Sequence, residues 1–339
     1  MRDVNSSSSA VKMQSISKSF GGIKALDNVD ISFQYHEIHS LLGENGAGKS
    51  TILKILRGIH SFNNGKVLID NNPIQNLTPQ NAKEYGIGMI FQEMSLVQSL
   101  TVAQNIYLGN EPKTKLGFID DSLIIKKSET IFKSMGININ PKEKLNNLTT
   151  GQQQLTEIAK ALSQNAKILI LDEPTSALTI SEVKILFNLL IKLKSEGKCI
   201  IYVSHRMEEI FQISDKITVL RDGKLINTKK INEYNLQTLI SDIMGKETKN
   251  LSDFRKQTNK KSKIILKVRN LSSLDKGGKY NFDLYKGEVL GIAGLLGSGR
   301  SRIARLLYGL ETKGSGNVIF NDNNIDIKNT IDSNKYKIA

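Results

Sequence analysis

Short apolar runs bounded by polar residues recur along the chain, with helical patterns between them. The clearest are IHSLLG (38–43), KILILDEP (167–174) and CIIYVSH (199–205). Runs of this length are typical of buried strands in a parallel sheet. The stretch KSTILKILRG (49–58) instead has apolar residues at helical spacing and ends on glycine. The pattern therefore predicts an α/β fold, a parallel sheet with helices on both faces.

The pattern also divides the chain. Residues from about 96 to 164 are richer in helical spacing, which indicates an inserted helical subdomain in a first domain over 11–245. Residues 246–263 are charged and almost free of apolar side chains, as in a linker. A strand-like run, IILKVRNLSS, opens a second domain over 264–339. We expect residues 1–10 to form a disordered tail.

The second domain repeats the start of the first without a gap. Arg300 lies 251 residues after Lys49, and the same offset pairs glycines at turn positions. The pairs are Glu37 with Glu288, Gly43 with Gly294, Gly48 with Gly299, Ser50 with Ser301, Gly58 with Gly309, Gly65 with Gly316, Asn72 with Asn323 and Tyr85 with Tyr336. The copy ends at Ala339, the counterpart of Gly88. We therefore expect an incomplete second unit that stops before any counterpart of Gln92.

The stretch GENGAGKS (43–50) matches G-x-x-x-x-G-K-[ST] between a predicted strand and a predicted helix. Small residues let backbone N–H groups surround phosphates at a helix N-terminus, where the helix dipole favours anions. Lys49 would contact the β- and γ-phosphates and Ser50 would ligate Mg²⁺. The candidate ATP-binding residues here are Gly43, Glu44, Asn45, Gly46, Ala47, Gly48, Lys49, Ser50 and Thr51.

Asp172 and Glu173 follow the apolar run 168–171 and so lie at the carboxyl end of a predicted central strand. Open α/β sheets bind ligands at this edge. Asp172 would hold Mg²⁺ through water, and Glu173 is the candidate base for an attacking water. An acidic pair can also simply end a strand, but the phosphate loop upstream favours the chemical role.

Composition limits the class of protein and its compartment but does not identify the function. The chain has 339 residues, enough for two domains, with 39% hydrophobic and 24% charged residues, as in a soluble globular protein. No apolar run reaches the roughly 20 residues of a membrane span, and the polar N-terminus lacks a signal core. Cys199, the single cysteine, is expected to be a buried thiol in a reducing compartment. The net charge of +14 comes mainly from scattered lysines and favours a solvated surface over a nucleic-acid stripe.

The order of motifs resembles an ABC-type ATPase: phosphate loop, FQE (91–93), LTTGQ (148–152), ILILDEP (168–174) and SH (204–205). The resemblance implies a P-loop NTPase fold that binds ATP and Mg²⁺. It assigns the signature turn, which acts on a partner's site, to Leu148, Thr149, Thr150, Gly151 and Gln152, with Thr150 where the family usually has glycine. It further implies that Gln92 contacts the metal and couples to a membrane partner, that His205 contacts the γ-phosphate, and that Phe20 stacks on adenine. A core position for Phe20 remains open.

Longer stretches of the sequence resemble one group within the ABC-type ATPases. The stretches GENGAGKST, GQQQLTEIAKALSQNAKILILDEPTSALT and YVSHRMEEIF resemble the ATP-binding subunits of monosaccharide importers of the galactose, ribose and xylose group. That group fuses two ATPase units and has a degenerate second phosphate loop, here Gly294, Gly297, Gly299, Arg300 and Ser301. A planar guanidinium does not reproduce the compact ammonium of Lys49 in a tight loop. We therefore expect the second site to bind nucleotide weakly.

The resemblance implies a role at the cytoplasmic face of the cell membrane, with transmembrane permease subunits as partners. An extracellular sugar-binding protein would act indirectly, and the signature turn would come from a second ATPase unit or a second copy. A nucleoside importer is an alternative. A tandem ribosome- or nucleic-acid-associated factor is a second alternative, disfavoured by the short linker and Arg300, so no nucleic acid is expected. A non-catalytic remnant also stays open, and the sequence does not identify the sugar.

Overall fold

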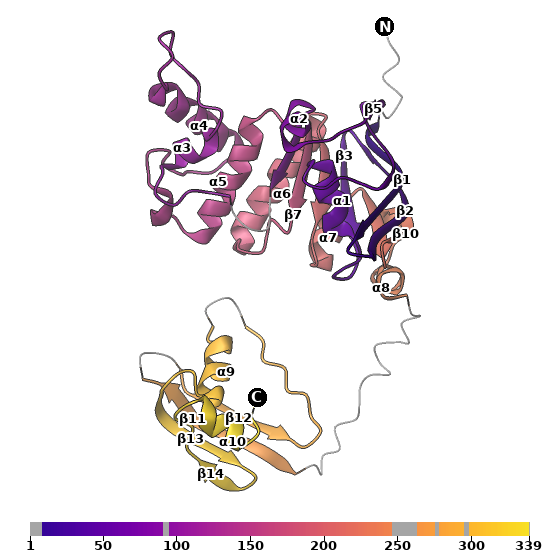
Figure 1. Cartoon of the computed structure of the whole chain (residues 1–339). Coiled ribbons are helices and arrows are strands. Elements are labelled where there is room, and N and C mark those ends of the chain that lie inside the picture. Colours follow the sequence, from indigo (N-terminus) through magenta and orange to yellow (C-terminus); the bar gives the residue numbers. More distant parts are fainter. Residues whose placement is uncertain (1–8, 91–94, 246–262, 275–277, 295–297, 339) are drawn as a thin grey trace. The chain divides into compact units, whose positions relative to one another are not determined.

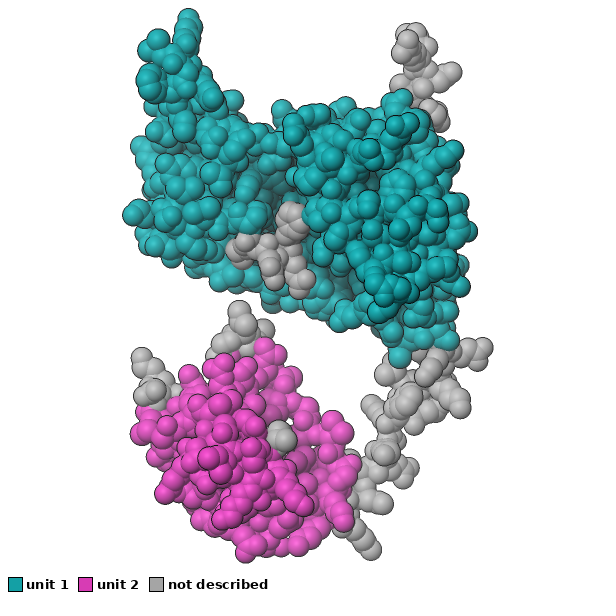
Figure 2. All heavy atoms as spheres, in the orientation of Figure 1, with its two compact units in different colours: residues 1–248 teal, residues 249–339 magenta. Residues whose placement is uncertain are grey.

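The structure is a computed structural model that describes residues 9–90, 95–245, 263–274, 278–294 and 298–338. It divides into two compact units, residues 1–248 and 249–339 (Figure 2). The predicted linker, 246–263, lies outside the described residues except for Lys263. Each unit is described below by itself.

The centre of the first unit is a six-stranded sheet in the order β10-β9-β3-β8-β7-β6. Its strands are β3 (Glu37–Leu42), β6 (Ile87–Ile90), β7 (Ile168–Asp172), β8 (Cys199–Val203), β9 (Lys216–Arg221) and β10 (Lys224–Lys230). Strands β6, β7, β8, β3 and β9 run parallel, and only β10 is antiparallel to its neighbour. The carboxyl ends of β3, β7 and β8 therefore meet at one edge, as the sequence predicts.

Alternate residues of these strands enter two separate cores. In β7, Leu169 and Leu171 join one buried cluster, whereas Ile168 and Ile170 join the other. Side chains of a strand alternate between faces, so both faces of this sheet are covered. Helices α1 (Lys49–Leu56), α2 (Pro79–Glu84), α6 (Ile180–Ser195), α7 (Met207–Ile213) and α8 (Leu236–Met244) belong to the same unit. Cys199 is a buried free thiol, as predicted.

A second sheet of the first unit is antiparallel, in the order β2-β1-β4-β5. Its strands are β1 (Ser9–Phe20), β2 (Ile23–Gln34), β4 (Asn64–Ile69) and β5 (Asn72–Ile74). The prediction of a tail over residues 1–10 is wrong for its last two positions. Ser9 and Ala10 begin β1 and are buried, because Ser9 pairs with Gln34 of β2 and Ala10 enters the core. Residues 1–8 lie outside the described part.

Between β6 and β7 the chain forms helices α3 (Val102–Tyr107), α4 (Asp121–Met135) and α5 (Thr150–Ser163), with a short 3₁₀ turn at Leu145–Asn147. Within the first unit, these helices group on the side away from β1 and β2 (Figure 1). Thr149 caps α5: its hydroxyl accepts a hydrogen bond from the Gln152 backbone N–H, and the Gln152 side chain accepts one from the Thr149 N–H. The signature turn therefore opens α5.

The second unit repeats the opening of the first element by element. Its sheet has the order β12-β11-β13-β14 and is built from β11 (Ile264–Ser273), β12 (Tyr280–Tyr285), β13 (Lys313–Phe320) and β14 (Asn323–Ile325). Helices α9 (Arg300–Tyr308) and α10 (Thr330–Lys335) accompany it. The starts of α9, β14 and α10 lie 251 residues after those of α1, β5 and α2, which confirms the repeat seen in the sequence.

One matched pair of glycines shows why the repeat keeps them. Gly58 and Gly309 both have positive φ angles, 76° and 77°. A Cβ at Gly58 would lie 2.3 Å from the carbonyl carbon of Thr78, and one at Gly309 would lie 2.4 Å from that of Asn329. Only glycine allows this turn and this close approach of the backbone.

The copy differs at the strand that precedes the loop. Residues 288–294, the counterparts of β3 and Gly43, form no strand in the second unit, and Val289 is 97% exposed. In the first unit β3 is held on both sides by β8 and β9. Among the described residues of the second unit, no strand pairs with residues 288–294. A strand needs such partners for its backbone hydrogen bonds.

Within the described ranges, every helix is too short or too polar to span a lipid bilayer.

A fully buried histidine sits in β3, just before the phosphate loop. His39 Nδ1 lies 3.0 Å from Glu37 Oε1, and Nε2 lies 2.7 Å from the hydroxyl of Thr218. Burial lowers the pKa of His39, and the opposing attraction of Glu37 does not cancel that effect. The folded chain therefore keeps this imidazole neutral at a pH where the unfolded chain has begun to protonate it.

We expect the free energy of unfolding to fall as the pH drops below the unfolded pKa of about 6.5. The unfolded state then binds one more proton than the folded state, so the slope from this residue approaches about 1.4 kcal/mol per pH unit. Urea unfolding between pH 5 and 8 measures it. His39→Gln should flatten the slope whatever it does to the absolute stability. Equal slopes in the wild type and His39→Gln would contradict the assignment.

Candidate nucleotide-binding site

The phosphate loop joins β3 to α1 and leaves the N-terminus of that helix open. Gly48 is the N-cap of α1, with φ of 103° and no side-chain hydrogen bond to the first turn. A Cβ at Gly48 would lie 2.7 Å from Leu26 Cδ2 and 2.8 Å from the Ala25 carbonyl oxygen. Glycine is therefore required both for the backbone angle and for the close packing. The first N–H groups of α1 remain available to an anion.

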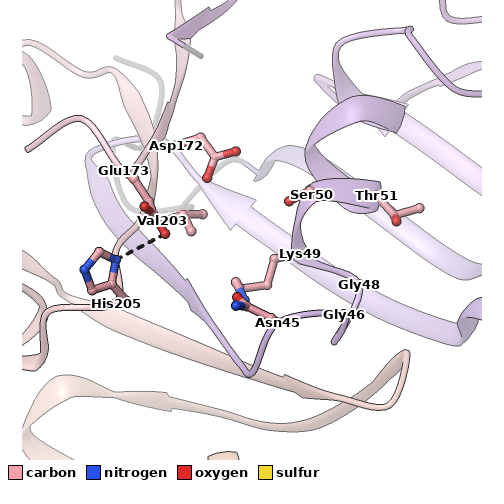
Figure 3. A pocket seen from close by; sticks show the side chains of 10 residues that line it. All are labelled: Asn45, Gly46, Gly48, Lys49, Ser50, Thr51, Asp172, Glu173, Val203 and His205. Carbon is pink, nitrogen blue, oxygen red and sulfur yellow. Dashed lines mark ion pairs between the residues drawn. The ribbon is translucent and has the colours of Figure 1, made fainter. Parts of the chain in front are cut away.

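A cavity of about 610 Å³ lies between this helix end and the carboxyl ends of β7 and β8, the size of a typical small-molecule site. It is lined by Asn45, Gly46, Gly48, Lys49, Ser50, Thr51, Asp172, Glu173, Val203 and His205. Figure 3 shows Lys49 and Ser50 on one side, with Asp172, Glu173 and His205 on the other. Segments more than 150 positions apart in sequence thus contribute to one site.

Lys49 is folded over its own loop. Its ammonium donates to the carbonyl oxygens of Gly43 at 2.7 Å and Glu44 at 2.9 Å. Burial lowers the pKa of Lys49, while Asp172 and Glu173 oppose that change. The cation is thus partly desolvated beside the helix N-terminus, which strengthens its attraction for an anion.

Asp172 ends β7 inside the cavity. Burial raises its pKa, the charge of Glu173 adds to the rise, and Lys49 and Lys54 oppose it. Two neighbouring carboxylates in a half-buried position favour a cation between them and a phosphate. The Asp172 carboxylate and the Ser50 hydroxyl offer oxygen ligands of the kind that Mg²⁺ prefers.

Glu173 is held in an uncommon backbone conformation. Its φ is +50°, in the left-handed region, and its N–H donates to the Val203 carbonyl oxygen at 2.9 Å. Its Oε1 lies 3.2 Å from His205 Nδ1. A non-glycine residue in this region is worth attention because such positions concentrate at functional sites. Here the turn places the Glu173 carboxylate beside His205, which follows β8.

The remaining predicted residues lie elsewhere. Gly43, Glu44 and Ala47 belong to the loop but do not line the cavity, and Ala47 is buried. Leu148, Thr149, Thr150, Gly151 and Gln152 open α5 and also do not line it. Gln92 and Gly297 lie outside the described residues. Val203 is the one lining residue that the motifs did not indicate; its position next to Ser204 and His205 at the end of an apolar run is the signal that could have found it.

Phe20, at the end of β1, is not a core residue. It is 42% exposed, its ring makes an edge contact with His60 at 5.1 Å, and Lys18 Nζ lies 5.0 Å from the ring centre. The Lys18 ammonium lies over the ring, and the exposed remainder of Phe20 is open to a planar base. The core alternative that the sequence left open for Phe20 is therefore excluded.

The profile of the ABC transporter family matches residues 26–176 and 278–339, more than half of the chain. The chain belongs to the ABC transporter family. The matched ranges include the cavity residues from Asn45 to Glu173 and the repeated segment in the second unit.

Comparison with curated proteins gives nearer relatives. The chain is 44% identical over 322 residues to the galactose/methyl galactoside import ATP-binding protein MglA of Clostridium perfringens (strain ATCC 13124), covering 94% of this chain and 62% of that protein. It is 43% identical over 323 residues to the protein of the same name from Pasteurella multocida (strain Pm70), covering 95% and 63%. The chain therefore spans a little over three fifths of the length of these relatives.

Solved structures agree on the fold. A nucleotide-free ATP-binding cassette from an ABC transporter is 26% identical, with a TM-score of 0.60 over 70% of this chain and 96% of that one. The cassette MJ0796, in a dimeric post-hydrolysis state bound to ADP and Pi, is 30% identical, with a TM-score of 0.58 over 65% of this chain and 98% of that one. The fold is that of an ABC-type P-loop NTPase, as the sequence predicts.

Proposed function

We propose that this chain binds ATP with Mg²⁺ through its first unit and hydrolyses it to energise a membrane importer of monosaccharides, of the galactose or methyl galactoside type. One observation carries the proposal: a single cavity brings Lys49 and Ser50 of the open helix end opposite Asp172 and Glu173. The printed names of the two MglA relatives support the sugar. The permease subunits and the location at the membrane's inner face belong to the same proposal.

The residues present fit a nucleoside triphosphate and its metal. Phosphate oxygens would accept from the loop N–H groups and from Lys49, while Phe20 offers its exposed ring to the adenine. Ser50 and Asp172 would hold Mg²⁺, with Gln92 as a further proposed ligand. Among the described residues no cluster of three or more His, Cys, Asp or Glu side chains holds a metal alone. Mg²⁺ typically takes few carboxylates plus phosphate oxygens, which agrees with this donor set.

Hydrolysis would then depend on Glu173 and His205. When bound, Mg²⁺ neutralises charge on the phosphates. Glu173 accepts the proton of the attacking water, and His205, 3.2 Å from that carboxylate, orients it and contacts the γ-phosphate. The products are ADP and inorganic phosphate.

We further propose that the second unit does not provide an equivalent site. Arg300 opens α9 where Lys49 opens α1, and a planar guanidinium does not reproduce the compact ammonium in a tight loop. The domain boundaries at 245 and 264 and the role of the signature turn Leu148–Gln152 toward a partner's nucleotide are part of the same proposal. The turn would then come from a second copy of this chain or from another ATPase unit.

Calorimetry with ATP and Mg²⁺ tests the proposal. We expect one nucleotide bound per chain, and slow phosphate release whose rate per molecule rises with protein concentration if the signature turn is supplied by a second copy of this chain. Two equal sites per chain would contradict the assignment of the second unit. A turnover rate independent of protein concentration would contradict the shared site, and no binding at all would overturn the function.

A further inference from the structure

Three buried hydroxyl groups converge on one carboxylate outside the cavity. Glu209, on α7, is 6% exposed. Its Oε2 accepts hydrogen bonds from Thr175 Oγ1 at 2.9 Å, Tyr202 Oη at 2.8 Å and Ser204 Oγ at 2.8 Å. Its Oε1 accepts from Arg206 Nη1 at 3.3 Å. Burying a carboxylate is costly unless it is hydrogen-bonded and compensated, and this one is both.

The donors come from the two strand ends that carry the catalytic candidates. Thr175 lies two residues after Glu173 in the turn that leaves β7, and Ser204 directly precedes His205 after β8. Ser204 also accepts from the Arg206 N–H at 3.1 Å, so its hydroxyl is fixed on both sides. Glu209 therefore links the segment that follows Glu173 to the segment that precedes His205.

The third donor reaches the carboxylate from within β8. Tyr202 is fully buried; burial, then the charge of Glu209, raises the pKa of its hydroxyl. That hydroxyl keeps its proton and donates. It does not connect the two strand ends, because Tyr202 lies in β8, the strand that Ser204 follows. Tyr202 thus shares the carboxylate oxygen without forming part of the link to β7.

We propose that Glu209 is a positioning residue. Through its hydrogen bonds with Thr175 and Ser204, it fixes the position of Glu173 relative to His205. Its role in ATP hydrolysis rests on the proposed function, whereas the coupling of the two side chains does not. Nothing else described between these strand ends combines a buried charge with donors from both. A displacement of about 1 Å in a catalytic pair costs on the order of 100-fold in rate, so a rigid link matters.

The variants follow from the geometry. Thr175→Val keeps the shape of a buried side chain and removes only the donor on the β7 side. Tyr202→Phe is the matched control, because it removes a hydroxyl from the same carboxylate oxygen but leaves the link intact. Glu209→Gln retains an acceptor oxygen and should act weakly, whereas Glu209→Asp shortens the side chain and should act strongly. Thermal unfolding of each variant checks that it remains folded.

The readout is the imidazole ring signal of His205 in the full chain, labelled with ¹³C-histidine and observed by NMR without nucleotide. The chain has four histidines, and His205→Gln assigns the signal. We expect Thr175→Val and Glu209→Asp to move the His205 signal in the direction that Glu173→Gln moves it, with those of His36 and His60 unchanged. Tyr202→Phe should leave it in place.

Two outcomes would overturn the proposal: a His205 signal unmoved by Thr175→Val, or one moved equally by Tyr202→Phe, as a purely structural role of Glu209 requires. A second measurement tests the effect on ATP hydrolysis. At high protein concentration Thr175→Val should lower turnover about tenfold with ATP affinity unchanged. If the wild-type chain does not bind ATP, the proposed function fails, while the NMR result still decides the coupling.

Discussion

Replacing Lys49 by alanine is expected to weaken ATP·Mg²⁺ binding by roughly 30- to 150-fold. The ammonium lies at the open end of α1, partly desolvated, and donates to the carbonyls of Gly43 and Glu44. A charge-assisted hydrogen bond to phosphate is worth about 2–3 kcal/mol, which corresponds to that factor. Calorimetry on the full chain, with Mg²⁺ held constant, measures the change.

Two further variants make this prediction specific. Lys66→Ala removes an exposed cation of β4 and should leave the affinity within about twofold, because it does not line the cavity. Lys49→Arg keeps the charge and places in the first loop the residue that the second loop already has at position 300. We expect it to bind almost as poorly as Lys49→Ala. Wild-type affinity in Lys49→Ala would show that the nucleotide lies elsewhere.

The parallel core could be predicted because its strands are short, apolar and bounded by turn residues. The buried strands 168–172 and 199–203 were predictable from their short apolar runs alone. The repeat located the second unit without any knowledge of contacts. The antiparallel sheet of the first unit was less accessible. Ser9 and Ala10 were assigned to a tail because nothing near them in sequence reports that Gln34 of β2 would pair with Ser9. Strand pairing is a tertiary property.

Residues 288–294 of the second unit show that an apolar sequence pattern alone does not decide whether a strand forms. Residues 288–294 are as apolar as their counterparts in β3, yet they form no strand, since the flanking strands of a parallel sheet come from distant sequence. Local similarity paired Lys49 with Arg300 and Asn72 with Asn323, and these residues begin matching elements, α1 with α9 and β5 with β14. It did not predict the state of residues 288–294, because the pairing of a strand depends on segments distant in sequence.

In the site, the loop and the acidic pair were predictable because their chemistry is local. The relation of Glu173 to His205 was available only through a family resemblance, and two structural facts beneath it have no sequence signal. These facts are the left-handed φ of Glu173 and the convergence of three hydroxyls on Glu209. Both arise where the turns after two neighbouring strands pack together. Gln92 remains a prediction.

The second large effect concerns Glu173. Glu173→Gln should lower the rate of phosphate release by at least about 100-fold, because glutamine has nearly the same shape but does not accept the proton of the attacking water. Affinity for ATP·Mg²⁺ should stay within about threefold, since Asp172, Lys49 and the helix end are untouched. Phosphate release at high protein concentration and calorimetry on the same preparation separate the two quantities.

The matched control for Glu173→Gln is Glu196→Gln, at an exposed position after α6 outside the cavity, which should change neither quantity. A comparison with His205→Gln makes the test stricter. Since His205 lies 3.2 Å from the Glu173 carboxylate, removing the base should leave little further loss when His205 is also replaced. The two variants should therefore be strongly non-additive. If the losses in rate instead multiply, the two side chains act in separate steps, and the assignment of His205 as the residue that orients Glu173 is wrong.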